Sequence, residues 1–552
     1  MKQVCDSKLL VGGIRVPLDA TDEDILKKAK DKMKRAGILL PTLHFRLYKK
    51  SVDARHRDDI CFVCTVLAEG KMPSALCSEA KLKKADARLL KEEALNPTYG
   101  NEPLRARPLV VGMGPAGLFA ALLLARNGYA PILIDRGASV EERVLDVASF
   151  RESGVLNTES NIQFGAGGAG TFSDGKLITR INDPRCGFVL ETLREFGAPE
   201  EIITRAKPHI GTDLLRQVVS AILGEICRLG GELHYHCRMD DFSELADGTL
   251  SVRTSLGDIR CGAMILAPGH SARDTYLRLL EKSFAIEPKP ISVGVRAEHL
   301  QSDIDVALYG RFAGHPNLGH AEYSLSDTRT GRGVYTFCMC PGGEVVAAAS
   351  EEGGLVVNGM SDHARSGPNA NAAVAVSIHC EDIEPVNGSV ALGAIEFQRR
   401  IERAAYAAGG GDYVAPVMTL GDFMSESRGS EPSRIQPSYR SGKVKITDFS
   451  RVFPQFVSDS LRYGFASFGK KLKGYDAPDA VLTAAETRTS APLRILREPT
   501  SLTAIGHKSI YPCGEGAGYA GGITSAAVDG VRSAMSLMER FAPLGEREEN
   551  EA

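Results

Sequence analysis

The chain has 552 residues, more than a single hydrophobic core usually holds, and 43% of them are hydrophobic, so we expect two or three domains. Its formal net charge of −3 lacks the basic excess that binding to a nucleic-acid backbone generates, which disfavours a nucleic-acid partner. The sequence has no signal-peptide core and no uninterrupted apolar run long enough to span a bilayer, which favours a cytoplasmic protein without a membrane partner.

Residues 1–95 are predicted to form a small domain of their own. One helix in it is well marked, because Thr21 is a suitable N-cap with Asp24 three residues on, and lysines fill the last turn before Gly37. Three apolar runs have the length and composition of strands: Leu9–Val16, His44–Tyr48 and Ile60–Leu67. This order predicts a βαββ sheet of the ferredoxin-like type.

The N-terminal part is basic, whereas the rest of the chain is acidic. Residues 1–100 carry a formal charge of +6 and the remainder −9. The basic helix is either a solvated face of a domain that braces its neighbour, or a docking surface for an acidic protein or RNA. A charged helix is predicted after Ser78, followed by a Pro-containing linker at 96–107.

A glycine-rich turn follows the next apolar strand. Leu109–Val111 leads directly into Gly112-Met-Gly114-Pro-Ala-Gly117 and then into a helical run. In this context the first glycine permits a tight turn, the second lets the backbone approach a pyrophosphate, and the third lets the helix pack on the sheet. The pattern predicts a dinucleotide site in which Pro115 and Ala116 also contact the ligand.

An acidic residue ends the following strand. Asp135 lies 18 residues after Gly117, which is where a carboxylate accepts the ribose hydroxyls of a bound dinucleotide. Arg136 beside it either covers the adenine or is solvated. Because NAD and FAD share this fingerprint, a second feature has to distinguish between them.

The C-terminal region supplies that feature. A strand-like run ends at Gly514-Glu515 and is followed by a glycine-rich loop that enters a helix at Gly522-Ile523-Thr524. Here the sequence resembles the FAD-dependent oxidoreductases with the glutathione-reductase-type fold. The resemblance implies that Glu515 binds a hydroxyl near the ribityl chain or phosphate, and that the helix start offers amides to the pyrimidine edge of the flavin, where it stabilises reduced flavin. The acid is usually aspartate, so Glu515 departs from the pattern.

Two further segments resemble the same superfamily. The apolar run that ends at Ala267-Pro-Gly269 is similar to the strand at which the chain leaves the FAD domain, and Met239 matches the strand end that contacts adenine. The glycine-rich loop 161–176 resembles that of an uncharacterised family of bacterial FAD-dependent dehydrogenases related to fumarate-reductase-like flavoproteins. That likeness implies that the flavin is contacted by Gly168, Gly170, Thr171, Ser173 and Asp174. The alternative is that the loop is structural and does not contact flavin.

These motifs predict an α/β chain with a Rossmann-like, three-layer FAD-binding domain on a parallel sheet. The domain is expected in two parts, 108–285 and 481–545, interrupted by an α+β substrate domain at 286–480 and followed by an acidic tail at 546–552.

Catalytic residues are poorly marked. Cys338 and Cys340 are either a redox pair or apolar-face cysteines of a strand, and the Cys61/Cys64 pair lies in a strand-like run with no second pair at ligand spacing, so no metal site is predicted. His363 and Arg365 either bind an anionic substrate or lie on the surface. Arg488 either clamps a carboxylate or stabilises reduced flavin, or it pairs with Glu486.

The sequence therefore predicts a flavoprotein oxidoreductase, a dehydrogenase or reductase that binds FAD non-covalently and transfers hydride or electrons through flavin N5 to or from a small organic substrate. No second GxGxxG and no CxxC after the first helix are found, which disfavours the disulfide-reductase layout. The reductant is then NADH or NADPH bound transiently, or a protein electron donor. The alternative is a flavin-dependent RNA- or protein-binding or modification factor that docks through the basic N-terminal domain.

Overall fold

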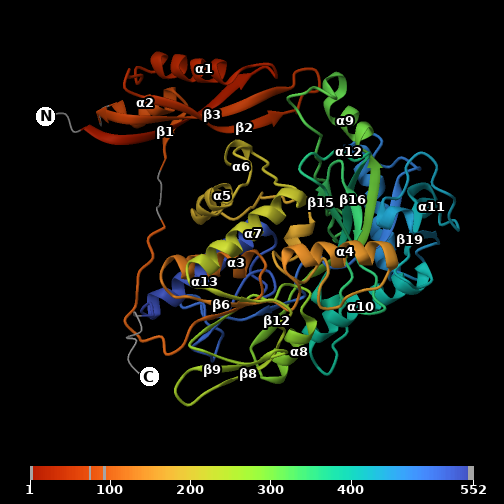
Figure 1. The fold of residues 1–552 in the computed structure, drawn as a ribbon. Coiled ribbons are helices and arrows are strands. Elements are labelled where there is room, and N and C mark those ends of the chain that lie inside the picture. Colours follow the sequence, from red (N-terminus) through yellow and green to blue (C-terminus); the bar gives the residue numbers. More distant parts are fainter. Residues whose placement is uncertain (1–3, 74–75, 91–94, 545–552) are drawn as a thin grey trace.

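The computed structural model describes residues 4–73, 76–90 and 95–544 and shows an α/β protein with both parallel and antiparallel sheets. Figure 1 shows a small N-terminal unit set apart from a larger body, in which one region is built on a parallel sheet and another on a mainly antiparallel sheet. Among the described residues, no helix combines the length and the apolarity needed to cross a membrane.

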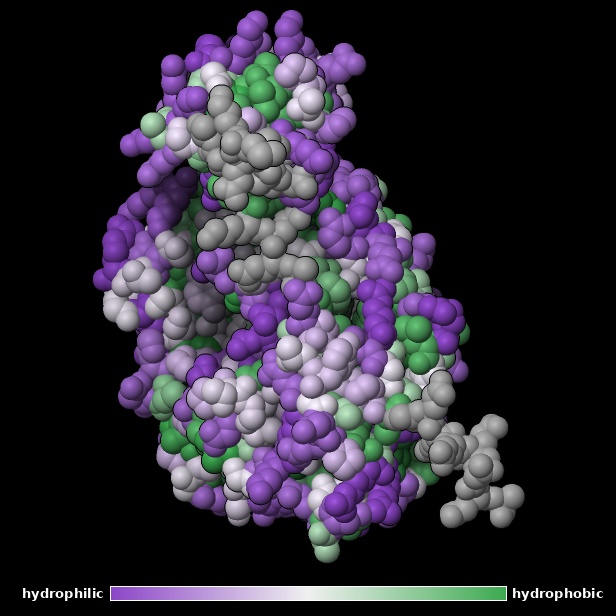
Figure 2. Space-filling view, turned by 90° about the vertical axis from the view of Figure 1, so that its left-hand side faces the viewer, coloured by the Kyte–Doolittle hydropathy of each residue, from purple (hydrophilic) through white to green (hydrophobic). Residues whose placement is uncertain are grey.

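The N-terminal unit is an antiparallel sheet with strand order β2-β3-β1-β4. Helix α1 packs its apolar face, Ile25, Ala29 and Met33, against the sheet, and the predicted capping box between Thr21 and Asp24 is present. The elements are β1 (Val4–Val16), α1 (Asp22–Arg35), β2 (His44–Asp53), β3 (Cys61–Pro73), α2 (Glu79–Lys84) and β4 (Ala87–Leu89). The outer surface of this unit, at the top of Figure 2, is mostly hydrophilic.

The charged helix predicted after Ser78 is shorter than expected. It ends at Lys84, and the chain then forms β4, in which Leu89 lies opposite Leu9 of β1. The backbone groups of the sheet edge offer hydrogen bonds that a local charge pattern does not reveal, so the strand replaces further helix. The unit also contacts the body of the protein, where the Asn317 side chain donates to the Leu18 carbonyl at 3.0 Å.

The parallel sheet has the order β23-β11-β5-β6-β7 and takes its strands from two distant parts of the chain. Alternate residues of each strand face opposite ways: Val110 packs among the helices α3, α7 and α13, whereas Leu109 and Val111 pack with the three-stranded sheet β8-β9-β10. The strands are β5 (Leu109–Val111), β6 (Ile132–Ile134), β7 (Glu232–His234), β11 (Met264–Leu266) and β23 (Ile510–Pro512).

This region therefore has three layers, with the parallel sheet between helices on one side and antiparallel strands on the other. Helix α3 is buried nearly all round because it lies between the sheet and α13. The covering elements are α3 (Pro115–Arg126), α7 (Thr212–Arg228), α13 (Ile523–Arg540), β8 (Met239–Glu244), β9 (Leu250–Thr254) and β10 (Gly257–Cys261).

A seven-stranded sheet forms the other region, in the order β14-β15-β18-β13-β21-β19-β20. All its neighbouring strands are antiparallel except β19 and β20. Its elements are β13 (Ile291–Leu300), β14 (Ser326–Asp327), β15 (Val334–Cys340), β18 (Asn369–Ile378), α10 (Val390–Gly409), β19 (Ala415–Thr419), β20 (Val444–Ile446), α12 (Gln455–Lys471) and β21 (Val481–Glu486).

The two regions are joined by a ribbon in which β12 pairs antiparallel with β22, so the chain leaves and re-enters the parallel-sheet region at the same place. The remaining helices and strands are α4 (Val140–Ser153), α5 (Arg185–Glu195), α6 (Glu201–Thr204), α8 (Arg273–Glu281), β12 (Ile286–Pro288), α9 (Gln301–Tyr309), β16 (Glu344–Ala347), β17 (Val357–Met360), α11 (Leu420–Ser425) and β22 (Leu493–Ile495).

Candidate functional site

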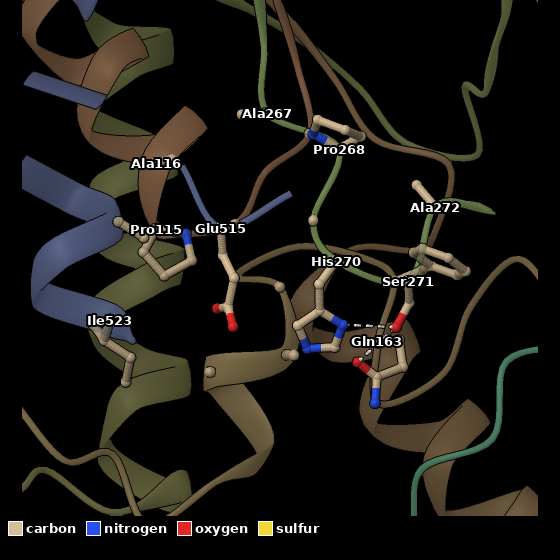
Figure 3. Close-up of a pocket in the computed structure, with 18 of the residues that line it drawn as sticks. Pro115, Ala116, Gln163, Ala267, Pro268, His270, Ser271, Ala272, Glu515 and Ile523 are labelled. Carbon is tan, nitrogen blue, oxygen red and sulfur yellow. Dashed lines mark hydrogen bonds between the residues drawn. The ribbon is translucent and has the colours of Figure 1, made fainter. Parts of the chain in front are cut away.

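A cavity of about 330 Å³ lies at the carboxyl edge of the parallel sheet and extends to the seven-stranded sheet. This edge is where open α/β sheets bind their ligands. Most of the cofactor contacts predicted from the sequence line this one cavity: Gly112, Gly114, Pro115, Ala116, Asp135, Arg136, Gly168, Gly170, Ser173, Asp174, Met239, Ala267, Gly269, Glu515, Gly522 and Ile523. Figure 3 shows Pro115, Ala116, Ala267, Glu515 and Ile523 in the wall.

The three glycines of the turn after β5 are needed for different reasons. A Cβ on Gly112, whose φ is +101°, would lie 2.2 Å from the Ala267 carbonyl oxygen. A Cβ on Gly117 would lie 1.9 Å from the carbonyl oxygen of Gly112. Gly114 has no such neighbour, since its Cβ would meet only the Cα of Gly168 at 3.8 Å. Gly112 and Gly117 are therefore required by packing, whereas Gly114 keeps the cavity wall open.

Asp135 holds the glycine loop to the end of β6. Its carboxylate accepts hydrogen bonds from the backbone N–H of Met113 at 2.8 Å and of Gly137 at 2.9 Å. Each oxygen retains a second lone pair, and the residue lines the cavity, so it can also accept from a ligand hydroxyl. The neighbouring Arg136 is not simply solvated, because its guanidinium lies 4.5 Å from the centre of the Phe164 ring.

The glycine-rich loop 161–176 is organised by a residue that the sequence did not mark. Arg143 of α4 is fully buried, and its guanidinium donates to the carbonyls of Asn161, Ile162 and Ala166 at 2.7 to 2.8 Å. Burial lowers the pKa of Arg143 to about 9, so the side chain stays charged at neutral pH. Only the fold brings this arginine to the loop, because the local pattern of α4 is that of an ordinary charged helix.

Four of the predicted contact residues lie behind the cavity wall. Gly117 packs against Gly112, and the backbone N–H of Gly514 donates to the Asp529 carboxylate at 2.8 Å. The hydroxyl of Thr524 donates to the Leu177 carbonyl at 2.8 Å, and the Thr171 carbonyl accepts from the Thr212 hydroxyl at 2.6 Å. These residues support the wall instead of lining it.

Glu515 points into the cavity toward His270, as Figure 3 shows. Within the described part of the chain, its carboxylate has no hydrogen-bond partner. Burial raises the pKa of Glu515 to about 7, and the nearby Lys289 only partly opposes this. The pKa of His270 is lowered to about 4, mainly by burial. At neutral pH the cavity therefore presents a carboxyl group that is partly protonated and can donate a hydrogen bond, beside a neutral imidazole.

Arg488 also lines the cavity, but its ion-pair partner is not Glu486, the partner that the sequence offered. It pairs with Glu402 of α10 at 3.1 Å, whereas Glu486 faces Arg296 across the sheet at 3.3 Å. The proposed Glu486–Arg488 pair is not formed because β21 ends between the two residues, and Arg488 turns toward α10. Glu402 offsets the Arg488 charge, which leaves less of it for a substrate anion.

His363 and Arg365 do not line the cavity. The His363 ring stacks on His209 with 5.2 Å between ring centres, and its Nδ1 lies 2.9 Å from the Ile210 carbonyl oxygen. Arg365 is buried and pairs with Asp174 at 2.5 Å and with Glu322 at 2.7 Å. Both side chains are thus held in internal contacts behind the loop 161–176.

The far end of the cavity contains residues that the sequence did not mark as ligand contacts. They are Lys176, His270, Phe337, Asn358 and Thr489, together with Cys338. Lys176 is paired with Asp174 at 2.6 Å. Phe337, Cys338 and Asn358 come from the seven-stranded sheet and from β17, so this end is closed by the second region of the body.

The sequence is 45% identical over 531 residues to an uncharacterized protein from Clostridium beijerinckii, which covers 95% of this chain and 96% of that protein. The chain therefore belongs to the same protein family as this relative. Residues 290–489 match the family described as "FAD-dependent protein, C-terminal domain-like", which spans the seven-stranded sheet.

Similar solved structures include CtdE in complex with FAD and the halogenase PltM. The CtdE structure is 11% identical, covers 78% of this chain and 82% of that chain, and has a TM-score of 0.31. The PltM structure is 10% identical, covers 79% and 67% respectively, and has a TM-score of 0.35. These scores are too low to transfer a site from either structure.

Proposed function

We propose that this protein is an FAD-dependent oxidoreductase, with FAD held non-covalently in the cavity at the carboxyl edge of the parallel sheet. The observation that carries the proposal is the composition of one cavity wall. It unites the GxGxxG turn, Asp135, the loop 161–176 and the start of α13, which are far apart in the sequence. The match of residues 290–489 to a family of FAD-dependent proteins supports the same cofactor.

The residues present fit an FAD molecule. Gly114 leaves room for a pyrophosphate to approach the start of α3, where backbone N–H groups favour an anion. Asp135 has acceptor capacity for ribose hydroxyls. At the other end, Gly522 is the N-cap of α13, an 18-residue helix whose N-terminus favours negative charge on a reduced flavin.

Bound FAD would supply two-electron transfer at flavin N5. The chain contributes orientation and a controlled environment around that position. Arg143 holds the glycine loop 161–176 in place, and Phe337 and Ile523 give the cavity wall apolar surface. Glu515, with a pKa raised to about 7 by burial, is able to donate or accept a proton at neutral pH. The substrate is a small organic molecule, and the reductant is NADH, NADPH or a protein donor.

The visible absorption spectrum of the purified protein tests this proposal. We expect flavin bands, release of FAD as the chromophore on denaturation, and rapid bleaching when NADH or NADPH is added without oxygen. Flavin that does not bleach with either nucleotide would point to a protein donor. A colourless protein that takes up no added FAD would refute the proposal.

A further inference from the structure

Strand β15 carries an irregularity where it borders the cavity. Phe337 lies opposite Ala373 of β18 and Cys340 lies opposite Asn371, so β15 has one residue more than its partner between these points. Cys338, within this bulge, has φ of +45°. A residue with a Cβ is strained there, and such strain tends to be kept where a side chain has to be aimed at a functional site.

The bulge directs Cys338 to the cavity wall and leaves Cys340 fully buried behind it. The Cys340 thiol donates to the Cys338 carbonyl oxygen at 3.3 Å, and the two side chains are close enough for each to shift the pKa of the other. The pair is therefore within reach of an S–S bond.

The surroundings of the pair favour a thiolate at its cavity side. The neighbouring Cys340 side chain, and then the positive charges of Arg296 and Lys176, lower the pKa of Cys338 to about 6 against the effect of burial. Arg296 is fully buried and donates to the Cys338 carbonyl at 2.9 Å. The pKa of Cys340 is raised, mainly by its contact with the Cys338 side chain and by burial.

Two other buried cysteines, Cys64 and Cys261, lack these features. Burial raises the pKa of Cys64 to about 11 and that of Cys261 to about 12. Thiols of this kind remain protonated and inert, whereas a thiolate beside a second thiol and cationic groups is the arrangement of reactive cysteines. The Cys338–Cys340 pair thus differs from them in position, in partner and in charge.

We propose that Cys338 and Cys340 are a redox-active dithiol that exchanges two electrons with a flavin in the same cavity. This inference rests on the proposed function, because the flavin is the electron partner. On oxidation, an S–S bond forms between the Cys338 thiolate and the Cys340 sulfur, and the Cys340 S–H bond breaks. Oxidised FAD accepts the two electrons and that proton. In the reverse direction, reduced FAD returns them and the S–S bond opens.

Differential alkylation tests the dithiol itself, with or without flavin. The protein is equilibrated anaerobically with mixtures of reduced and oxidised dithiothreitol, quenched with N-ethylmaleimide and digested with trypsin. The fragment 333–365 contains Cys338 and Cys340 and no other cysteine. We expect this fragment to change from two alkyl groups to none in a single two-electron transition. A fragment that keeps both alkyl groups in every mixture, or loses them one at a time, would overturn the proposal.

A second measurement tests the link to flavin. In the holoprotein, reduced dithiothreitol added without oxygen should bleach the flavin through the pair. Cys338→Ser, and independently Cys338→Ala, should slow this bleaching at least tenfold. Cys380→Ser, in the same region but outside the cavity, should not change it. Equal bleaching rates in all variants would overturn the electron exchange. A protein without flavin would refute the proposed function, while the alkylation result would still decide whether the dithiol forms.

Discussion

Replacing Gly114 with alanine separates cofactor binding from folding. The φ of −71° and ψ of 178° at Gly114 suit any residue, and the added Cβ would meet only the Gly168 Cα at 3.8 Å, an ordinary contact. Gly114 is the N-cap of α3, where alanine is a poorer cap, so we expect a loss of about 1 kcal/mol or less in the free energy of unfolding. In the proposed complex, however, the methyl group occupies the space of the pyrophosphate.

The expected effect on FAD is an increase in Kd of at least tenfold, equivalent to about 1.4 kcal/mol. Gly117→Ala should instead act mainly on folding. Its Cβ would lie 1.9 Å from a backbone oxygen, so α3 would have to move. We expect it to lower the free energy of unfolding by about 3 kcal/mol, the upper part of the range for overpacking.

Both effects are measured on the apoprotein, FAD affinity by fluorescence titration and stability by urea unfolding. Gly224→Ala is the matched control: it lies within α7, and a Cβ there meets nothing within 4 Å. It should stabilise the protein by about 1 kcal/mol and leave the FAD Kd unchanged. If Gly114→Ala binds FAD as tightly as the natural protein, the pyrophosphate does not lie against Gly114 and the proposed placement of FAD is wrong.

Three further predictions follow from the buried polar groups. Arg143→Met removes the donor to several loop carbonyls. We expect urea unfolding to show a loss of about 3 kcal/mol or more in the free energy of unfolding, together with weaker FAD binding. Unchanged values would show that the loop folds correctly without Arg143. Glu515 has a folded pKa of about 7 against 4.5 ordinarily, so the folded state binds more protons between these values and stability falls as pH rises through this window. Glu515→Gln should abolish that fall, which is at most about 3 kcal/mol, in apoprotein unfolding curves at pH 5 and pH 8; an equal slope in both proteins would contradict the assignment. The rate at which Cys338 reacts with N-ethylmaleimide should reach half its maximum near pH 6. Cys340→Ser should move that midpoint toward the ordinary cysteine pKa of about 8.5. A midpoint already near this ordinary value in the natural protein would contradict the presence of a thiolate at Cys338.

The sequence alone was informative wherever the determinant is local. The α1 capping box depends on residues three apart, and the turn after β5 depends on glycines within six residues and an apolar strand before them. Asp135 follows for the same reason, because the helix and strand between it and the turn have a limited range of lengths. Such patterns act through backbone conformation and hydrogen bonds to near neighbours, which the order of residues reveals directly.

The contacts that only the tertiary structure decided join residues far apart in the chain. The short helix before β4 yields to pairing with β1, Arg488 pairs with Glu402 of α10 and not with the nearby Glu486, and Arg143 reaches a loop that its own helix pattern does not indicate. The bulge that aims Cys338 into the cavity depends on the register between β15 and β18. Strand register and buried ion pairs depend on which elements meet in space, and a single sequence contains no local signal for that. The sequence therefore determined the locally encoded elements and the glycine-rich turn, whereas packing determined strand pairing, which charges are paired and which side chains the cavity exposes.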